Sequence, residues 1–166
     1  MALITLPVVA PVVAQATGIA STYVGAYVGL VYLAAMFSSV LGGTAVKRFG
    51  AIRLSQGCLM LTATGLILCA VPHPLSMAVG ALFIGAGYGP VTPASSHLLI
   101  KTTPPERLSL VFSLKQTGVP IGGVLAGLLV PQFELLLGWQ WAFLLVGAFC
   151  LVCAYSVKPL RAALDE

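Results

Sequence analysis

Positions 23–46 of the sequence read YVGAYVGLVYLAAMFSSVLGGTAV, a run of 24 residues without a charged side chain. A helix of about 20 apolar residues crosses the roughly 30 Å hydrocarbon core of a bilayer, because each residue advances the helix by about 1.5 Å. A backbone in lipid must satisfy its own hydrogen bonds, and this run lacks the apolar–polar alternation of a strand. The stretch therefore predicts a transmembrane helix.

Similar apolar runs follow at residues 54–71, 75–100, 108–137 and 138–157, interrupted by charge only at Lys115 and Glu134. An earlier run at residues 2–14 is short for a span. It is either a re-entrant helix or a span that lacks its first turns, and we favour the second interpretation. Together the runs predict an all-α membrane protein with a six-transmembrane-helix bundle over residues 1–157, its first helix truncated, and a cytoplasmic tail over 158–166.

The composition agrees with this assignment, since hydrophobic residues make up 59% of the chain and charged residues 7%. Soluble domains carry roughly 25% charged residues, so most of this surface must face lipid. All four cysteines lie in apolar runs, and the C-x-x-C of Cys150 and Cys153 has no second ligand pair nearby. We expect packing cysteines, with no metal and no cofactor. The N-terminus lacks a basic region, so no cleavable signal peptide is predicted.

Basic residues mark one side of the predicted bundle. The segments after the second, fourth and sixth helices contain every Lys and Arg except Lys115, and those after the first, third and fifth contain none. Because basic loops stay in the cytoplasm, both termini are predicted to be cytoplasmic. The net charge of +4 is then explained by topology, and no nucleic-acid partner is needed. The basic residues are Lys47, Arg48, Arg53, Lys101, Arg107, Lys158 and Arg161.

Glycines recur four residues apart on several predicted helices. This spacing lets two helix backbones approach closely in a membrane, and the set as a whole predicts a compact bundle. The pairs are Gly25 and Gly29, Gly85 and Gly89, Gly118 and Gly122, and Gly123 and Gly127.

Three segments combine polar groups with helix breaks. Residues 43–53 end a helix and turn at Gly50 with three cations, as a topology-determining loop also would. Residues 85–97 form a glycine-rich helix broken by prolines, with His97 near its cytoplasmic end. Residues 113–123 place Lys115, Gln116 and Thr117 before a Gly/Pro break. The Lys115 ammonium either extends back to the headgroups or faces a polar cavity.

These segments, in this order, resemble the N-terminal half of a major facilitator superfamily transporter. Residues 43–53 are similar to the family motif G-x-x-x-D-R-x-G-R-R: Gly43, Arg48 and Gly50 match, whereas Lys47 stands in place of the Asp. The terminal Arg pair is replaced by Ala51 and Ile52.

The later segments show the same resemblance with further departures. The fourth helix is similar to the family's glycine-rich segment, but Ala81 takes the place of its arginine. Residues 118–123 resemble the Gly/Pro motif of helix five, with Val119 between the Gly and the Pro. Residues 138–143, GWQWAF, resemble the start of helix six.

The resemblance implies one six-helix half of a twelve-helix fold, in which residues 158–166 begin the central loop. We expect a secondary transporter in a bilayer of the bacterial inner-membrane type that moves a small polar, and by Lys115 an anionic, solute by alternating access. Helices one, four and five would line its cavity, and a second six-helix half, either C-terminal or from a homodimer partner, would complete it. The implied solute contacts are Lys115, Gln116, Tyr88 and Thr92. The implied conformational motif residues are Gly43, Arg48, Gly50, Arg53, Gly118, Pro120, Gly122 and Gly123.

Two other classes of helical membrane protein are alternatives to a transporter. A membrane-embedded enzyme needs a nucleophile with a base, or a metal cluster. The two histidines, His73 and His97, are far apart in sequence, and the only carboxylate within a span is Glu134 near an end. An enzyme is therefore not expected. A non-transporting fragment or assembly partner stays open as the alternative.

Overall fold

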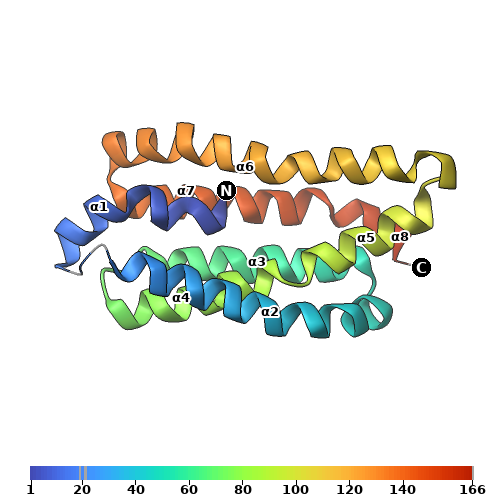
Figure 1. Ribbon diagram of the computed structural model, residues 1–166, viewed down its shortest axis with the longest axis horizontal. Helices are drawn as coiled ribbons and strands as arrows, with labels where there is room; N and C mark the ends of the chain where they lie inside the picture. The colour runs from blue at the N-terminus through green and yellow to red at the C-terminus, as the bar shows by residue number, and fades with distance from the viewer. Residues whose placement is uncertain (19, 21, 166) are drawn as a thin grey trace.

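The computed structural model describes residues 1–18, 20 and 22–165, and all regular structure within them is helical. The helices run alongside one another in one elongated bundle (Figure 1). Three short 3₁₀ turns accompany them: η1 (Ala2–Ile4), η2 (Pro105–Arg107) and η3 (Lys158–Leu160). The helices are α1 (Thr5–Thr17), α2 (Tyr23–Phe49), α3 (Ala51–Cys69), α4 (Pro74–Tyr88), α5 (Val91–Thr102), α6 (Leu108–Leu137), α7 (Trp139–Ser156) and α8 (Arg161–Leu164).

Within the described residues, five helical segments are long and apolar enough to cross a membrane, and the predicted all-α membrane bundle is confirmed at this level. The segment Ala2–Thr17 is apolar but shorter. The helix α1 within it continues beyond the apolar run of residues 2–14 to Thr17 and ends at Gly18, which has φ +70°. Met1 lies partway along the bundle, so α1 spans only part of its length (Figure 1). The six-helix count remains a prediction.

The fourth predicted span consists of two helices, α4 and α5. Pro90 and Pro93 lack backbone N–H groups and so interrupt the hydrogen-bond ladder. Gly89 (φ −56°, ψ −54°) and Pro90 (φ −72°, ψ −14°) nevertheless keep right-handed helical dihedrals. The chain therefore continues in one direction, and Pro74–Thr102 acts as a single span.

The connection at residues 47–53 is shorter than an open basic loop. Lys47 and Arg48 occupy the last turn of α2, where a cation interacts favourably with the helix dipole. Only Gly50, with φ +86°, separates α2 from α3. That dihedral suits glycine, because a Cβ there is strained.

The C-terminal segment folds back onto the same end of the bundle. The Asp165 carboxylate accepts hydrogen bonds from the backbone N–H groups of Ile52, at 2.7 Å, and Arg53, at 2.9 Å. These N–H groups belong to the first turn of α3 and have no partner within their own helix. Residues 158–165 are thus structured by capping α3.

One end of the bundle collects the basic residues. The α2–α3 and α5–α6 connections and the C-terminus lie at this end, and the α1–α2, α3–α4 and α6–α7 connections lie at the other (Figure 1). The arrangement agrees with the alternation predicted from the sequence, while its orientation in a membrane stays a prediction. This basic end carries Lys47, Arg48, Arg53, Lys101, Arg107, Lys158 and Arg161.

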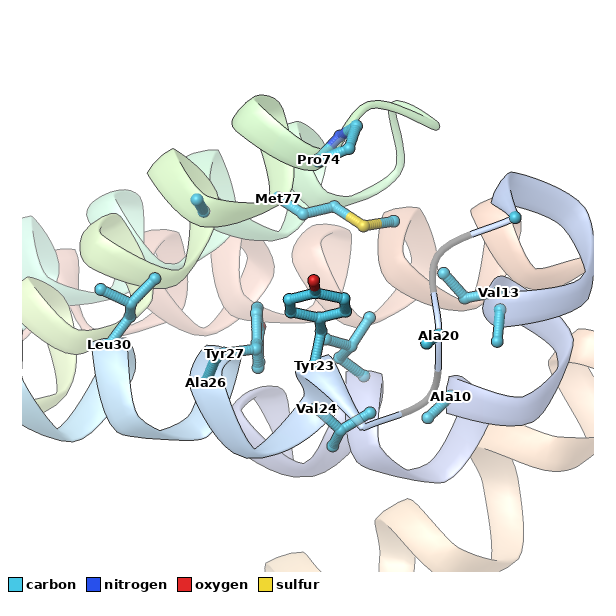
Figure 2. Close-up of a pocket in the computed structure, with 14 residues that line it drawn as sticks. Ala10, Val13, Ala20, Tyr23, Val24, Ala26, Tyr27, Leu30, Pro74 and Met77 are labelled. Atoms are coloured by element: carbon cyan, nitrogen blue, oxygen red, sulfur yellow. The ribbon is translucent and has the colours of Figure 1, made fainter.

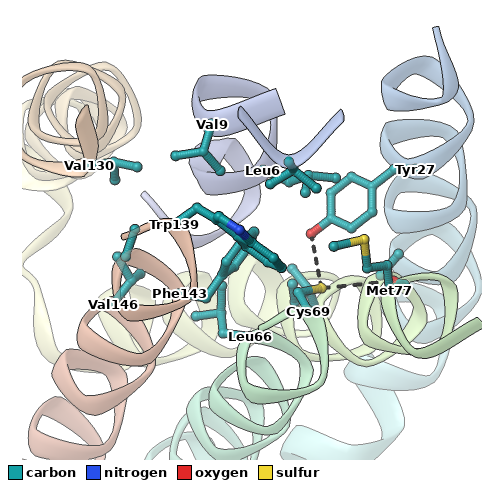
Figure 3. Close-up of a cluster of buried hydrophobic side chains, with 14 of the residues drawn as sticks. Leu6, Val9, Tyr27, Leu66, Cys69, Met77, Val130, Trp139, Phe143 and Val146 are labelled. Atoms are coloured by element: carbon teal, nitrogen blue, oxygen red, sulfur yellow. Dashed lines mark hydrogen bonds between the residues drawn. The ribbon is translucent and has the colours of Figure 1, made fainter. Parts of the chain in front are cut away.

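The main core joins α1, α2, α3, α4, α6 and α7 (Figure 3). Trp139 and Phe143 of α7 pack edge to face, with ring centroids 6.1 Å apart. The Tyr27 hydroxyl and the Cys69 thiol are hydrogen-bonded at 3.7 Å, and the thiol also donates to the Met77 carbonyl oxygen at 3.8 Å. The buried polar groups of α2, α3 and α4 therefore satisfy one another within the apolar core.

Glycines of α4 allow its closest contacts. A Cβ at Gly85 would collide with the Val31 carbonyl oxygen of α2. On the α3 side, a Cβ at Gly80 would lie 2.6 Å from the Gly65 carbonyl oxygen. By contrast, space is open around Gly29 of α2. Glycine is therefore required where α4 packs on its neighbours, as small residues are at many membrane helix contacts.

Gly85→Ala should destabilise the protein by about 1–3 kcal/mol, because the added methyl group forces α4 away from the α2 backbone. Gly29→Ala is the matched control: it adds the same methyl group in open space and improves helix propensity. Thermal unfolding in detergent, followed by circular dichroism, should show a lower melting temperature for the first variant only. Equal melting temperatures would contradict the close approach.

Candidate functional site

Lys115 of α6 is held by α5. Its Nζ donates hydrogen bonds to Ser96 Oγ at 2.9 Å and to the Thr92 carbonyl oxygen at 3.4 Å. Nζ also lies 5.5 Å from the ring centroid of Phe112, within the range of a cation–π contact. No ion pair joins Lys115 to a carboxylate in the part of the chain that the structure describes. The ammonium is thus positioned by neutral groups that leave its charge uncompensated.

The depth of this ammonium distinguishes the two interpretations of Lys115. The residue lies about 10 Å along α6 from the basic end, at about 1.5 Å per residue. On α5, Ser96 lies about 9 Å and Thr92 about 15 Å from the last residue of that helix, Thr102, by the same rise. Nζ is therefore bonded to groups well inside α5 and not at its end. This geometry differs from that of a lysine extended toward the headgroups.

Tyr88, Thr92 and Ser96 follow one another at intervals of four residues along the α4–α5 span. Residues at this spacing share one helix face, here the face that meets Lys115. Tyr88 also packs edge to face on Tyr32 of α2, with centroids 6.4 Å apart. Sequence reasoning missed Ser96, although its spacing from Thr92 and Tyr88 could have identified it.

The structure brings Lys115 and Thr92 together and places Tyr88 one turn further along the same face. Gln116 is exposed, and within the described residues no hydrogen bond joins it to the other three predicted solute contacts. Thr117 donates its hydroxyl to the Leu114 carbonyl oxygen of its own helix at 2.6 Å. The polar cluster therefore consists of Lys115 together with one face of α4–α5.

The predicted motif residues lie apart from this cluster. Arg48 stacks over the Phe49 ring at 5.3 Å, and Gly50 lies against the Asp165 side chain. Gly43 and Gly118 have open space where a Cβ would stand. A Cβ at Gly122 would lie 3.1 Å from the Met1 nitrogen, and a Cβ at Gly123 would lie 3.6 Å from Ile4 Cδ1. Pro120 lies inside α6, and Arg53 lies in the first turn of α3.

An apolar cavity of about 680 Å³ lies at the end of the bundle opposite the basic end. Its walls come from α1 and from the first turns of α2 and α4 (Figure 2). The lining is largely aliphatic, with the rings of Tyr23 and Tyr27 and the side chain of Met77 among it. A cavity of this size and character suits a small lipophilic group.

The fold and the cluster define a polytopic helical membrane protein with an uncompensated cation among its helices. The family model described as Major Facilitator Superfamily matches residues 1–163. The chain therefore belongs to the major facilitator superfamily, and the resemblance found in its motifs is confirmed.

Several curated proteins are similar to parts of the chain. A protein named "Multi-drug resistance efflux pump PmrA homolog" from Lactococcus lactis is 33% identical over 62% of the chain and 28% of its own length. The hexuronate transporter of Bacillus subtilis is 23% identical over 90% of the chain and 36% of its own length. "Probable anion transporter 7" of Oryza sativa is 28% identical over 80% of the chain and 30% of its own length. The chain thus spans roughly a third of the length of these relatives, which are named as transporters or pumps. No solved structure matches it.

A water-filled cavity at Lys115 predicts a difference in thiol labelling. In a background without the native cysteines, Lys115→Cys should react with a membrane-impermeant methanethiosulfonate reagent, because such reagents need water. Leu114→Cys is the control, since Leu114 is 69% exposed on an apolar face of α6 that lipid or another helix bundle would cover, leaving no water there. Mass spectrometry of the labelled protein measures both rates. Equal labelling, or labelling of the control alone, would count against a cavity.

Proposed function

We propose that this chain is the N-terminal half of a secondary transporter that moves a small polar anion across a membrane by alternating access. The single observation that carries the proposal is the Lys115 ammonium, which Ser96 and Thr92 hold within the bundle without a carboxylate partner among the described residues. A charge at membrane depth is costly, so it is retained where it acts on a solute or lines a pathway. Lys115 would bind the anion, and Ser96 and Tyr88 would offer hydroxyl groups beside it.

The names of two relatives support an anionic solute. One is a hexuronate transporter and the other carries the word anion in its name. A carboxylate solute would pair with the ammonium and accept hydrogen bonds from neighbouring hydroxyls, and charge-assisted bonds of this kind are the stronger class.

A second six-helix half is part of the proposal. Few residues of α2 and α6 are buried: Tyr27, Val31, Ala35, Gly42 and Val46 of the first, and Ala126 and Val130 of the second. Gly25 and Gly29 on α2 and Gly118 on α6 have open space where a Cβ would stand. Such glycines suit close approach by another helix. Either a C-terminal half or a second copy would cover them.

Efflux of lipophilic compounds is the second candidate function. The 680 Å³ apolar cavity at α1, α2 and α4 favours it, as does the relative named as a multidrug efflux pump. This activity would depend on the cavity walls at Tyr27 and Met77 and not on Lys115. The same Lys115 variants therefore separate the two candidates.

In the complete transporter, Lys115→Ala should abolish uptake of labelled glucuronate and other small carboxylates into vesicles, because the anion loses its cation. Lys115→Arg should lower uptake without abolishing it, since the guanidinium keeps the charge but presents it in a different geometry. Circular dichroism should show that both variants are folded. Ser113→Ala, two residues away on α6, is the matched control.

If both Lys115 variants transport carboxylates normally, the anion proposal is wrong. If carboxylate uptake is absent from the start and extrusion of a lipophilic dye persists in both variants, the efflux function is supported instead.

A further inference from the structure

A groove of about 650 Å³ opens between α3 and α7 at the basic end, away from the Lys115 cluster. Its first wall is formed by residues 53, 56, 57 and 60 of α3, and its second by residues 151, 154 and 155 of α7 and by residue 158 of η3, which continues the same helical segment. Both sets follow the spacing i, i+3, i+4, i+7, so each occupies one face of its helix. Arg161, at the start of α8, closes the outer end.

Both walls change from cationic to apolar with depth. Arg53 and Lys158 stand at the basic end, whereas Met60 and Leu151 lie about 10 Å deeper on their helices, at about 1.5 Å per residue. Gly57 leaves space between the walls, with no atom near the position of a Cβ. The groove therefore combines three cations at the membrane surface with an apolar trough beneath them.

The cations are available to an anion. Lys158 Nζ lies 5.9 Å from the ring centroid of Tyr155, which holds it over the groove wall. Arg161 Nε is buried and has no hydrogen-bond partner among the described residues. The nearby carboxylate of Asp165 is engaged by the backbone N–H groups of Ile52 and Arg53. A buried donor without a partner is costly, so a rotation of the Arg161 side chain that brings its guanidinium to a phosphate in the groove would be favourable.

We infer that this groove binds one anionic phospholipid, with the phosphate between Arg53, Lys158 and Arg161 and an acyl chain along Met60, Gly57 and Leu151. A free phosphate anion would meet the same cations. The lipid is the occupant because the cations lead directly into an apolar trough that runs along two membrane-spanning helices. Basic pockets between transmembrane helices recognise lipid headgroups in this way, each Lys or Arg contributing about a fivefold gain in affinity.

Native mass spectrometry of the full chain in detergent tests the inference, with phosphatidylglycerol and phosphatidylcholine of identical acyl chains as probes. The unmodified chain should bind phosphatidylglycerol about a hundredfold more tightly, because three cations each contribute about fivefold. Lys158→Gln combined with Arg161→Gln should reduce that preference to about fivefold. Lys101→Gln combined with Arg107→Gln removes the same charge from the basic end outside the groove. This double variant should keep the full preference for phosphatidylglycerol. Glycerol phosphate at equal concentration should not displace the lipid.

If the two double variants lose the preference for phosphatidylglycerol equally, the lipid is attracted to the basic end as a whole, and the proposed site is overturned. Displacement by glycerol phosphate would overturn the lipid assignment. If the Lys158/Arg161 variant fails to fold by circular dichroism, Arg53→Gln serves in its place and should weaken phosphatidylglycerol binding about fivefold. An unchanged affinity in Arg53→Gln would also overturn the site. Lys158→Arg combined with Arg161→Lys keeps both charges and should bind as the unmodified chain does.

Discussion

Along α4, glycines stand where its backbone meets α2 and α3. Gly85 and Gly89 lie against carbonyl oxygens of α2, and Gly80 and Gly87 against carbonyl oxygens of α3. Lipid solvates apolar side chains as well as a protein core does, so helices in a bilayer associate through close packing and not through the hydrophobic effect. This contact fixes the α4–α5 span, which in turn brings Thr92 and Ser96 to Lys115 of α6. The polar cluster thus depends on the requirement for glycine at position 85, about one helical turn before Tyr88.

Much of this fold could be predicted from the sequence because a bilayer admits few solutions. Uncharged runs of sufficient length must be helices. The alternation of basic and uncharged connections correctly predicted which connections lie together at each end of the bundle. The turn at Gly50 was predicted and is confirmed, whereas it was not evident that Lys47 and Arg48 would continue α2 up to that glycine. The capping of α3 by Asp165 joins residues more than 100 positions apart, and no local pattern encodes such a contact.

The candidate site was predicted only in part. Lys115 was identified because a charge within an apolar run is conspicuous, and Thr92 because it follows a proline break. The sequence could not decide whether the Lys115 ammonium extends to the headgroups or turns into the bundle. That choice depends on how α5 and α6 are aligned, which hydrophobic periodicity does not specify. Ser96 was missed for the same reason. The α3–α7 groove could not be predicted, because it forms where one face of α3 packs antiparallel to one face of α7 and neither face has a distinctive sequence pattern.

We propose that this bundle works as one of two halves, because α2 and α6 carry exposed glycine-bearing faces. Alternating access rocks one bundle against another around a shared site, so a single bundle has nothing to move against. The most direct test is uptake of labelled small carboxylates by vesicles that contain either the monomeric chain or the chain together with a second six-helix half. We expect uptake only in the second preparation. Uptake by a demonstrably monomeric chain would contradict it.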